Sequence, residues 1–182
     1  KLIIEEILRS ICNIDPEWRA IIFRYFNPIG AHESGLIGDN PINCPNNLLP
    51  FICQVAIGKR KKLFVFGDDY PTSDGTGKRD YIHVDDLANA HALSINYFEK
   101  TNNSFSVFNL GTGKSFSVLE VIKAFEEATS IKIPYKIVKR RDGDVCESLA
   151  DPSKAKLELG WEAKFDLKRM CIDSWRWQSI NP

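Results

Sequence analysis

Residues 20–26 read Ala20-Ile21-Ile22-Phe23-Arg24-Tyr25-Phe26, a short apolar run rich in β-branched and aromatic side chains. Such a run predicts a strand that is buried on both faces, as in a parallel sheet. The predicted strand ends at Asn27-Pro28-Ile29-Gly30. Ligands of open α/β sheets bind at the carboxyl ends of the strands, which makes residues 25–27 a candidate site. An ordinary Asn turn at the end of a strand is an equally good interpretation.

The rest of the chain alternates between the patterns of strands and helices. Further strands are expected at 63–67, 79–84, 106–110 and 135–138, and helices at 2–11, 46–57, 85–98, 117–129, 152–159 and 167–177. Asp85 is the expected N-cap of its helix. The predicted buried face of that helix consists of Leu87, Ala90, His91, Ser94 and Phe98. This order of elements predicts an α/β fold.

The first helix has its apolar face in full pattern from Leu2 onward, but no Ser, Thr, Asp or Asn precedes it as a cap. A helix without a start signal resembles the continuation of a longer helix. We therefore expect that the sequence lacks an N-terminal region.

Composition restricts the partners and the compartment. The 182 residues are 43% apolar, and 24 Lys and Arg balance 24 Asp and Glu, so a core is expected but a nucleic-acid-binding face is not. Five cysteines without a Cys-x-x-Cys pair favour free thiols in a reducing compartment. The longest apolar stretch, 48–57, is too short to span a membrane. We expect a cytoplasmic protein whose partner is a small molecule or another copy of itself.

Three familiar motifs are excluded by their spacing. Residues 111–115 suggest a phosphate-binding P-loop, but Phe108 stands where that loop requires glycine, so a tight turn is the better interpretation. The acidic loop 68–75 lacks the spacing of a calcium site. The three histidines are scattered along the chain, and no metal is expected.

Arg79 and Arg141 each stand beside an acidic residue in a loop that is predicted near strand ends. A guanidinium group fits a diphosphate better than a lysine does, because its planar fork can donate two parallel hydrogen bonds. The alternative is a pair of surface ion pairs, Arg79 with Asp80 and Arg141 with Asp142 or Asp144. Spacing alone slightly favours the ion pairs.

Five motifs then occur in order along nearly the whole chain. They are Arg24-Tyr25-Phe26-Asn27-Pro28 with Gly30-Ala31-His32, Pro45-Asn46-Asn47-Leu48, residues 74–84, Asn109-Leu110-Gly111-Thr112-Gly113 and residues 140–144. Together they resemble the nucleotide-sugar epimerases of the extended short-chain dehydrogenase/reductase family. The resemblance covers the C-terminal half of that family. It implies the last elements of a Rossmann-type parallel sheet, about 1–30 and 79–113, with a smaller mixed α/β substrate domain.

The chain departs from the family at its start. The Gly-rich turn that binds the NAD pyrophosphate, the catalytic serine and the tyrosine of the Tyr-x-x-x-Lys pair are absent from the sequence, and Lys1 aligns with the lysine of that pair. The resemblance implies that Lys1 lowers the pKa of the absent tyrosine. The 182 residues alone are therefore expected to be inactive.

The resemblance also assigns residues to the two ligands. The residues implied beside the NAD nicotinamide are Lys1, Tyr25 and Phe26. The residues implied in the UDP-sugar site are Tyr25, Phe26, Asn27, Asn46, Asn47, Leu48, Phe64, Val65, Phe66, Arg79, Arg141, Asp144 and Ser148. Within that set, residues 64–66 would line the uracil slot and the two arginines would clamp the diphosphate. Asp144 would accept a hydrogen bond from a ribose hydroxyl.

The implied activity is the NAD-dependent interconversion of UDP-galactose and UDP-glucose by reversible oxidation at sugar C4, in a homodimer. Ser148 stands where a bulky aromatic residue would exclude N-acetylated sugars, so conversion of UDP-N-acetylglucosamine and UDP-N-acetylgalactosamine is also expected. Two alternatives stay open. One is another UDP-sugar member of the family, a decarboxylase or a dehydratase, and the other is a non-catalytic nucleotide-sugar binding module.

Overall fold

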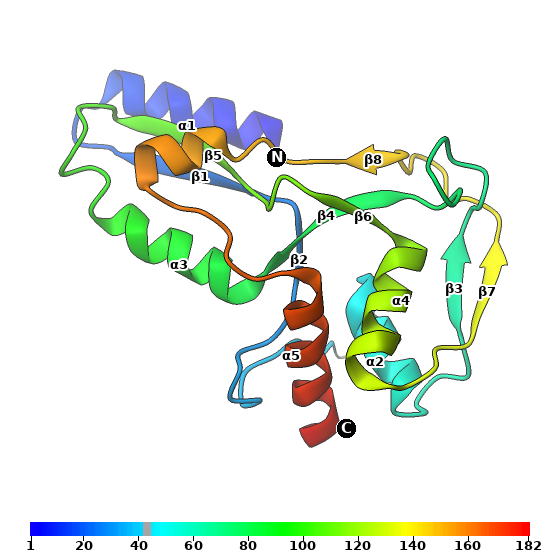
Figure 1. Ribbon diagram of the computed structural model, residues 1–182. Coiled ribbons are helices and arrows are strands. Elements are labelled where there is room, and N and C mark those ends of the chain that lie inside the picture. Colours follow the sequence, from blue (N-terminus) through cyan, green and yellow to red (C-terminus); the bar gives the residue numbers. More distant parts are fainter. Residues whose placement is uncertain (42–44) are drawn as a thin grey trace.

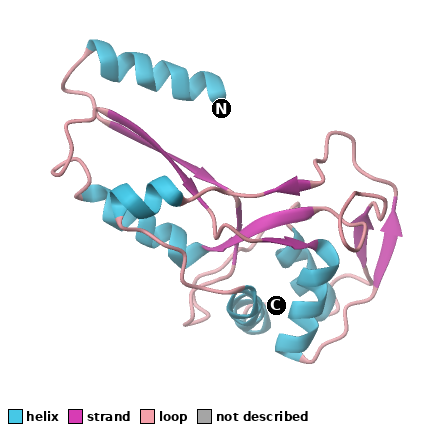
Figure 2. Cartoon of the chain, turned by 45° about the horizontal axis from the view of Figure 1, so that its top comes forward, coloured by secondary structure: helices cyan, strands magenta, loops and turns pink. Residues whose placement is uncertain are grey.

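The computed structural model describes residues 1–41 and 45–182 and has the predicted α/β architecture (Figure 1). In these residues the strands form three small sheets: β1 with β5, β2 and β4 with β6 and β8, and β3 with β7. Figure 2 shows the first pair running toward the second sheet. β1 (Ala20–Tyr25) is separated from β2 (Asn27–Ile29) by a single residue. The chain therefore passes directly from the first sheet into the second.

The first sheet pairs β1 in parallel with β5 (Phe105–Leu110), with Tyr25 opposite Leu110. Figure 1 shows α1 (Leu2–Ile14) on one face of this pair and α3 (Val84–Ile95) on the other. The five-residue π-helix η1 (Ala155–Leu159) packs on β5 and α3 and is closed by Gly160. Ile82, Phe108 and Trp161 are at the centre of the core that these elements share.

Full burial of the first strand is a wrong prediction. Residues 20–23 are half-buried, whereas Arg24 and Tyr25 are exposed. The sheet has only two strands, and α1 turns much of its apolar side away from it, because Leu2 and Ile3 are 68% and 75% exposed. In the described residues, the two faces of this pair are only partly covered, so the side chains at the end of β1 stay accessible.

The second sheet is built around β4 (Lys78–His83). β2 pairs with it in parallel, β6 (Ser115–Ser117) pairs antiparallel, and β8 (Glu147–Ser148) pairs in parallel. The sequence analysis missed β2, β6 and β8. Strands of two or three residues are too short to show alternation, so their pairing follows from the tertiary structure rather than from local pattern.

Three helices pack together beside the second sheet, as Figure 1 shows: α2 (Leu48–Ala56), α4 (Val118–Thr129) and α5 (Leu167–Ile180). α4 begins with a capping box, in which Ser117 and Glu120 each bond the other's backbone N–H group. β3 (Leu63–Phe66) and β7 (Tyr135–Val138) form a parallel pair at the edge of this core. The predicted bounds of these elements are confirmed within a few residues.

The start of α3 differs from the prediction. His83, not Asp85, is the N-cap, and its Nδ1 accepts the Asp85 N–H at 3.0 Å. Asp86 is buried and accepts from the backbone N–H groups of Lys164 and Phe165. His91 is exposed instead of buried. An imidazole nitrogen here takes the acceptor role that the oxygen of an Asp or Ser side chain usually has.

Cys12, Cys53 and Cys171 are buried free thiols, as expected of small apolar side chains, while Cys146 is exposed. Cys44 lies outside the described residues. Burial raises the pKa of Cys171 to about 12. The described part of the chain contains no helix that is long and apolar enough to cross a membrane.

Candidate functional site

Seven of the predicted site residues meet at one cavity of about 230 Å³. They are Asn27, Asn46, Asn47, Leu48, Arg79, Arg141 and Asp144. β2 contributes the first of them, the start of α2 the next three, β4 contributes Arg79, and the loop after β7 contributes the last two. Strands and a helix terminus far apart in sequence thus converge on one polar cavity.

Two arginines share one carboxylate in this cavity. Arg79 Nη2 lies 3.5 Å from Asp144 Oδ1, and Arg141 Nε donates to Asp144 Oδ2 at 3.2 Å. The ion pair of Arg141 with Asp144 is one of the pairs that the sequence analysis weighed. Pairing between Arg79 and Asp80 is a wrong prediction. One carboxylate between two guanidinium groups leaves a net positive charge at the cavity.

Asp80 instead lies on the other face of β4, fully buried. Its carboxylate accepts from the N–H and hydroxyl of Thr112, the N–H of Gly113 and the N–H of Ala150. A buried carboxylate is tolerated when several donors saturate its oxygens. Asp80 therefore ties the turn before β6 and the segment after β8 to β4, and so holds the strand that carries Arg79.

Tyr81 is a cavity residue that the sequence analysis missed. It is buried, lines the cavity two residues after Arg79, and has no hydrogen-bond partner for its hydroxyl within residues 1–41 and 45–182. Burial raises the pKa of this phenol, which stays protonated and able to donate. The signal in the sequence was alternation, because residues two apart on a strand face the same side.

The N-terminus of α2 opens into the same cavity. Asn47 is the N-cap, but its side chain makes no capping hydrogen bond, and no acidic residue stands in the first turn. The free N–H groups and the helix dipole at such a terminus favour an anion. The arginines and this terminus therefore act on the same small volume.

Of the predicted uracil residues, two are accessible. Val65 is 1% exposed and its side chain is part of the core, so only its backbone is available to a ligand. Phe64 and Phe66 are 42% and 38% exposed on the opposite face of β3. The Arg141 guanidinium lies 4.5 Å from the centroid of the Phe66 ring. This contact joins the aromatic face of β3 to the cavity.

The remaining predicted residues lie outside the cavity. Ser148 pairs with Arg79 in the register of β8 and β4, so both side chains project from one face. Lys1 is exposed at the start of α1. Phe26 is half-buried, and its N–H donates to the Leu110 carbonyl.

Tyr25, also outside the cavity, is 47% exposed at the carboxyl end of β1, and its hydroxyl lies 2.7 Å from His91 Nε2. An accessible aromatic ring at this end of a parallel strand fits a nicotinamide. The 182 residues contain no Gly-x-Gly-x-x-Gly turn for a dinucleotide pyrophosphate. They therefore fit only the nicotinamide end of NAD.

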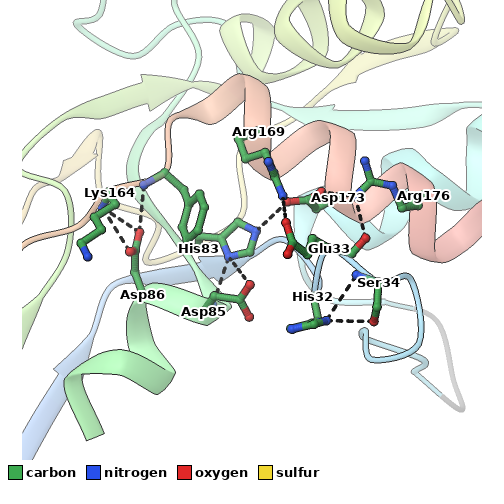
Figure 3. Close-up of polar contacts among 11 residues, drawn as sticks. His32, Glu33, Ser34, His83, Asp85, Asp86, Lys164, Arg169, Asp173 and Arg176 are labelled. Atoms are coloured by element: carbon green, nitrogen blue, oxygen red, sulfur yellow. Dashed lines mark hydrogen bonds and ion pairs between the residues drawn. The ribbon is translucent and has the colours of Figure 1, made fainter. Parts of the chain in front are cut away.

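A charge cluster around the buried His83 and Asp173 lies between β4, α5 and the loop that follows β2 (Figure 3). Asp173 accepts from Arg169 Nε at 2.5 Å and from Arg176 Nη1 at 2.7 Å. His83 Nε2 lies 3.3 Å from Asp173 Oδ2, without the alignment of a hydrogen bond. A Cβ on Gly30, which has φ 91°, would lie 2.6 Å from the His83 ring. The backbone at Gly30, just after β2, therefore packs directly against the His83 ring.

The arginines of this cluster also reach the loop that follows β2. Arg169 Nη2 donates to a Glu33 carboxylate oxygen at 2.8 Å, and Arg176 Nη1 donates to the Glu33 carbonyl at 2.7 Å. The described residues contain no group of three or more His, Cys, Asp or Glu side chains that could hold a metal ion. Through these two arginines, α5 is bonded to the loop that follows β2.

Residues 1–174 match the family model described as GDP-mannose 4,6 dehydratase. The UDP-glucose 4-epimerase of Bacillus subtilis is 55% identical over 183 residues, and the human UDP-glucose 4-epimerase is 53% identical over 182. These alignments cover all of this chain and 53% and 52% of those proteins, so the chain spans about half the length of the curated relatives it matches.

Solved structures show the same similarity. A UDP-glucose 4-epimerase from Stenotrophomonas maltophila with bound NAD and formylated UDP-arabinopyranose superposes with a TM-score of 0.96 at 49% identity. A UDP-glucose 4-epimerase from Bifidobacterium longum in complex with NAD+ and UDP gives 0.95 at 50% identity. Both alignments cover all of this chain and 54% of the other.

Proposed function

Because the chain belongs to the GDP-mannose 4,6 dehydratase family, we propose that it is the C-terminal, UDP-sugar-binding portion of an NAD-dependent UDP-glucose 4-epimerase. Relatives with that name at 53–55% identity favour the epimerase over a decarboxylase or a dehydratase. The full-length protein would interconvert UDP-galactose and UDP-glucose by reversible oxidation at sugar C4. In this proposal residues 1–30 and 79–113 belong to the nucleotide-binding fold, and the other residues form the substrate domain.

The observation that carries the proposal is the pairing of Arg79 and Arg141 with the single carboxylate of Asp144. A diphosphate brings about two negative charges and many acceptor oxygens, which match two guanidinium forks better than one carboxylate does. The Tyr81 hydroxyl and the N–H groups at the start of α2 offer further donors. Binding of the diphosphate would release Asp144 to accept from a ribose hydroxyl.

Other residues fit the two ends of the ligand. The exposed ring of Phe66, beside Arg141, and the backbone of β3 would hold the uracil. Asn27 and Asn47 would donate and accept hydrogen bonds toward the sugar and the diphosphate. Because the UDP end is bound far from the reacting carbon, its binding energy can hold the sugar while C4 changes configuration.

When bound, NAD supplies the hydride acceptor and donor for C4. Tyr25 and Phe26 would flank the nicotinamide at the carboxyl end of β1. The ammonium group of Lys1 would lower the pKa of a tyrosine outside this chain, because a nearby cation favours a phenolate. That phenolate would take the proton of the C4 hydroxyl. The proposed full-length protein is a homodimer whose subunits meet at the exposed apolar side of α1. Its proposed location is the cytoplasm.

The test compares the full-length protein with the 182 residues alone. Full-length protein with UDP-galactose and NAD should form UDP-glucose at about 1 s⁻¹ or faster. The 182 residues alone should form none, because they lack the pyrophosphate-binding turn and the tyrosine. Product analysis that shows a decarboxylated or dehydrated sugar would contradict the epimerase. Full-length protein that binds UDP without turnover would instead support a binding module.

A further inference from the structure

Tyr25 and His91 form a short chain of hydrogen bonds at the carboxyl end of β1. The Tyr25 hydroxyl lies 2.7 Å from His91 Nε2, and His91 Nδ1 lies 2.8 Å from the Leu87 carbonyl oxygen. A carbonyl oxygen can only accept, so Nδ1 carries the hydrogen of the neutral imidazole and donates it. Nε2 is then the acceptor, and the Tyr25 hydroxyl donates to it.

The imidazole is held on more than one side. Its ring centroid lies 4.8 Å from that of Phe23, which stands two residues before Tyr25 on the same face of β1. The Tyr25 ring meets His91 edge-on at 5.8 Å. His91 itself is exposed on α3, so burial in the core does not explain a histidine here. The feature that an apolar side chain would lack is the acceptor nitrogen that faces Tyr25.

We propose that His91 is a positioning residue that fixes the ring of Tyr25 for the nicotinamide end of NAD. This inference rests on the proposed function, which places Tyr25 beside the nicotinamide. A half-exposed tyrosine without an acceptor occupies several side-chain rotamers, and each binding event must then order it. His91 holds one orientation before the cofactor arrives. Because the Leu87 carbonyl fixes the imidazole tautomer, the acceptor always faces the hydroxyl.

The experiment uses the full-length protein and three substitutions. His91→Phe keeps a ring against Phe23 but removes the acceptor, and Tyr25→Phe removes the donor. His91→Gln is the matched control, because its amide oxygen can accept from the tyrosine. The measured quantities are the rate at which NAD dissociates, the affinity for UDP by calorimetry, and the melting temperature.

We expect NAD to dissociate about fivefold to tenfold faster from His91→Phe and from Tyr25→Phe, the effect of one lost hydrogen bond. The double variant should be no faster than either single variant, because both remove the same bond. His91→Gln should release NAD within about twofold of the wild-type rate. UDP affinity should be unchanged, since the cavity of Arg79 and Arg141 does not contain these residues.

Unchanged NAD dissociation in His91→Phe would overturn the inference while the proposed function stands. So would additive effects in the double variant, or equal losses of NAD retention, UDP affinity and melting temperature, which would show a purely structural role. A wild-type protein that retains neither NAD nor UDP would overturn the proposed function and this inference together.

Discussion

The two sheets differ in how their polar groups are satisfied. Around β4, Asp80, His83 and Asp173 are fully buried, and the two carboxylates accept hydrogen bonds from donors on several elements of the chain. Around β1, the charged and aromatic side chains at the end of the strand are exposed, and the best-formed ion pair is Arg24 with Glu5 of α1. Within these 182 residues, the region of β4 is therefore fixed by many internal contacts, whereas side chains in the region of β1 are exposed.

This difference has a functional consequence. Elements of this chain from β2 to the loop after β7 contribute the residues that line the cavity of Arg79 and Arg141. Tyr25 and Lys1, the residues proposed for the cofactor, lie on exposed surface at the β1 region. Substitutions near β4 should therefore act on folding and on UDP, and substitutions near β1 should act on NAD.

The largest expected effect is on stability, at Asp173. Asp173→Ala should lower the free energy of unfolding of the full-length protein by about 3–5 kcal/mol, because it leaves Arg169, Arg176 and His83 without their shared carboxylate. The measurement is chemical denaturation. Glu6→Ala, which breaks an exposed ion pair on α1, is the control and should cost about 0.5 kcal/mol or less. Equal losses of unfolding free energy in Asp173→Ala and Glu6→Ala would contradict the proposed difference between the β4 region and the β1 region.

The next effect is on ligand binding. Arg79→Ala in the full-length protein should weaken UDP binding by about 1.5–3 kcal/mol, the scale of a hydrogen bond to a charged group. Arg141→Ala should act in the same direction but less, because its side chain is 57% exposed against 20% for Arg79. Calorimetry with UDP measures both. NAD content should not change in either variant, and a loss of NAD would show that the two regions are not separate.

The elements that the sequence predicted are those with strong local signals. α4 has Ser117 and Glu120 at the spacing of a capping box, and β1 has a run of branched and aromatic residues. β8 has only two residues, so nothing local marks it, and it exists because its backbone pairs with β4. The cap at His83 was missed because histidine is an uncommon N-cap.

The candidate site was predicted less completely than the fold. Residue types and spacing slightly favoured ion pairs over a diphosphate clamp for the two arginines, and the family resemblance favoured the clamp. Asp144 lies only three residues from Arg141, but Arg79, its other partner, is far from it in the sequence. No local pattern contains that contact. The chemistry of the cavity therefore depends on tertiary structure, and so does the missed hydroxyl of Tyr81.

A smaller effect concerns sugar specificity. Ser148 is paired with Arg79 across β8 and β4, which places a small side chain beside the cavity. The full-length wild type should therefore interconvert UDP-galactose and UDP-glucose, and also UDP-N-acetylgalactosamine and UDP-N-acetylglucosamine. Ser148→Tyr should reduce the N-acetylated activity by about tenfold or more relative to the other pair, because steric exclusion depends on filled volume. An unchanged ratio would show that Ser148 does not border the sugar.

The smallest effect is on the pH dependence of stability, at Glu126 near the C-terminal end of α4. The Ile133 backbone N–H and the Lys132 ammonium group both bond this carboxylate and lower its pKa below the usual value. A carboxyl group whose pKa is lower in the folded state stabilises the protein above its unfolded pKa. That contribution is lost as the pH falls through the folded pKa.

Glu126→Gln should therefore destabilise the full-length protein at neutral pH by about 1 kcal/mol or less, since the ammonium group that pairs with it, on Lys132, is 89% exposed. The difference between the variant and the wild type should shrink as the pH falls below the usual pKa of a glutamate and through the lowered pKa of Glu126, because the wild-type carboxylate becomes protonated in that range. Denaturation curves across this range measure it. A difference that stays constant with pH would mean that the charge of Glu126 is not involved, and that its contacts act only through shape. A difference that grows as the pH falls would mean that folding raises the pKa of Glu126 instead of lowering it.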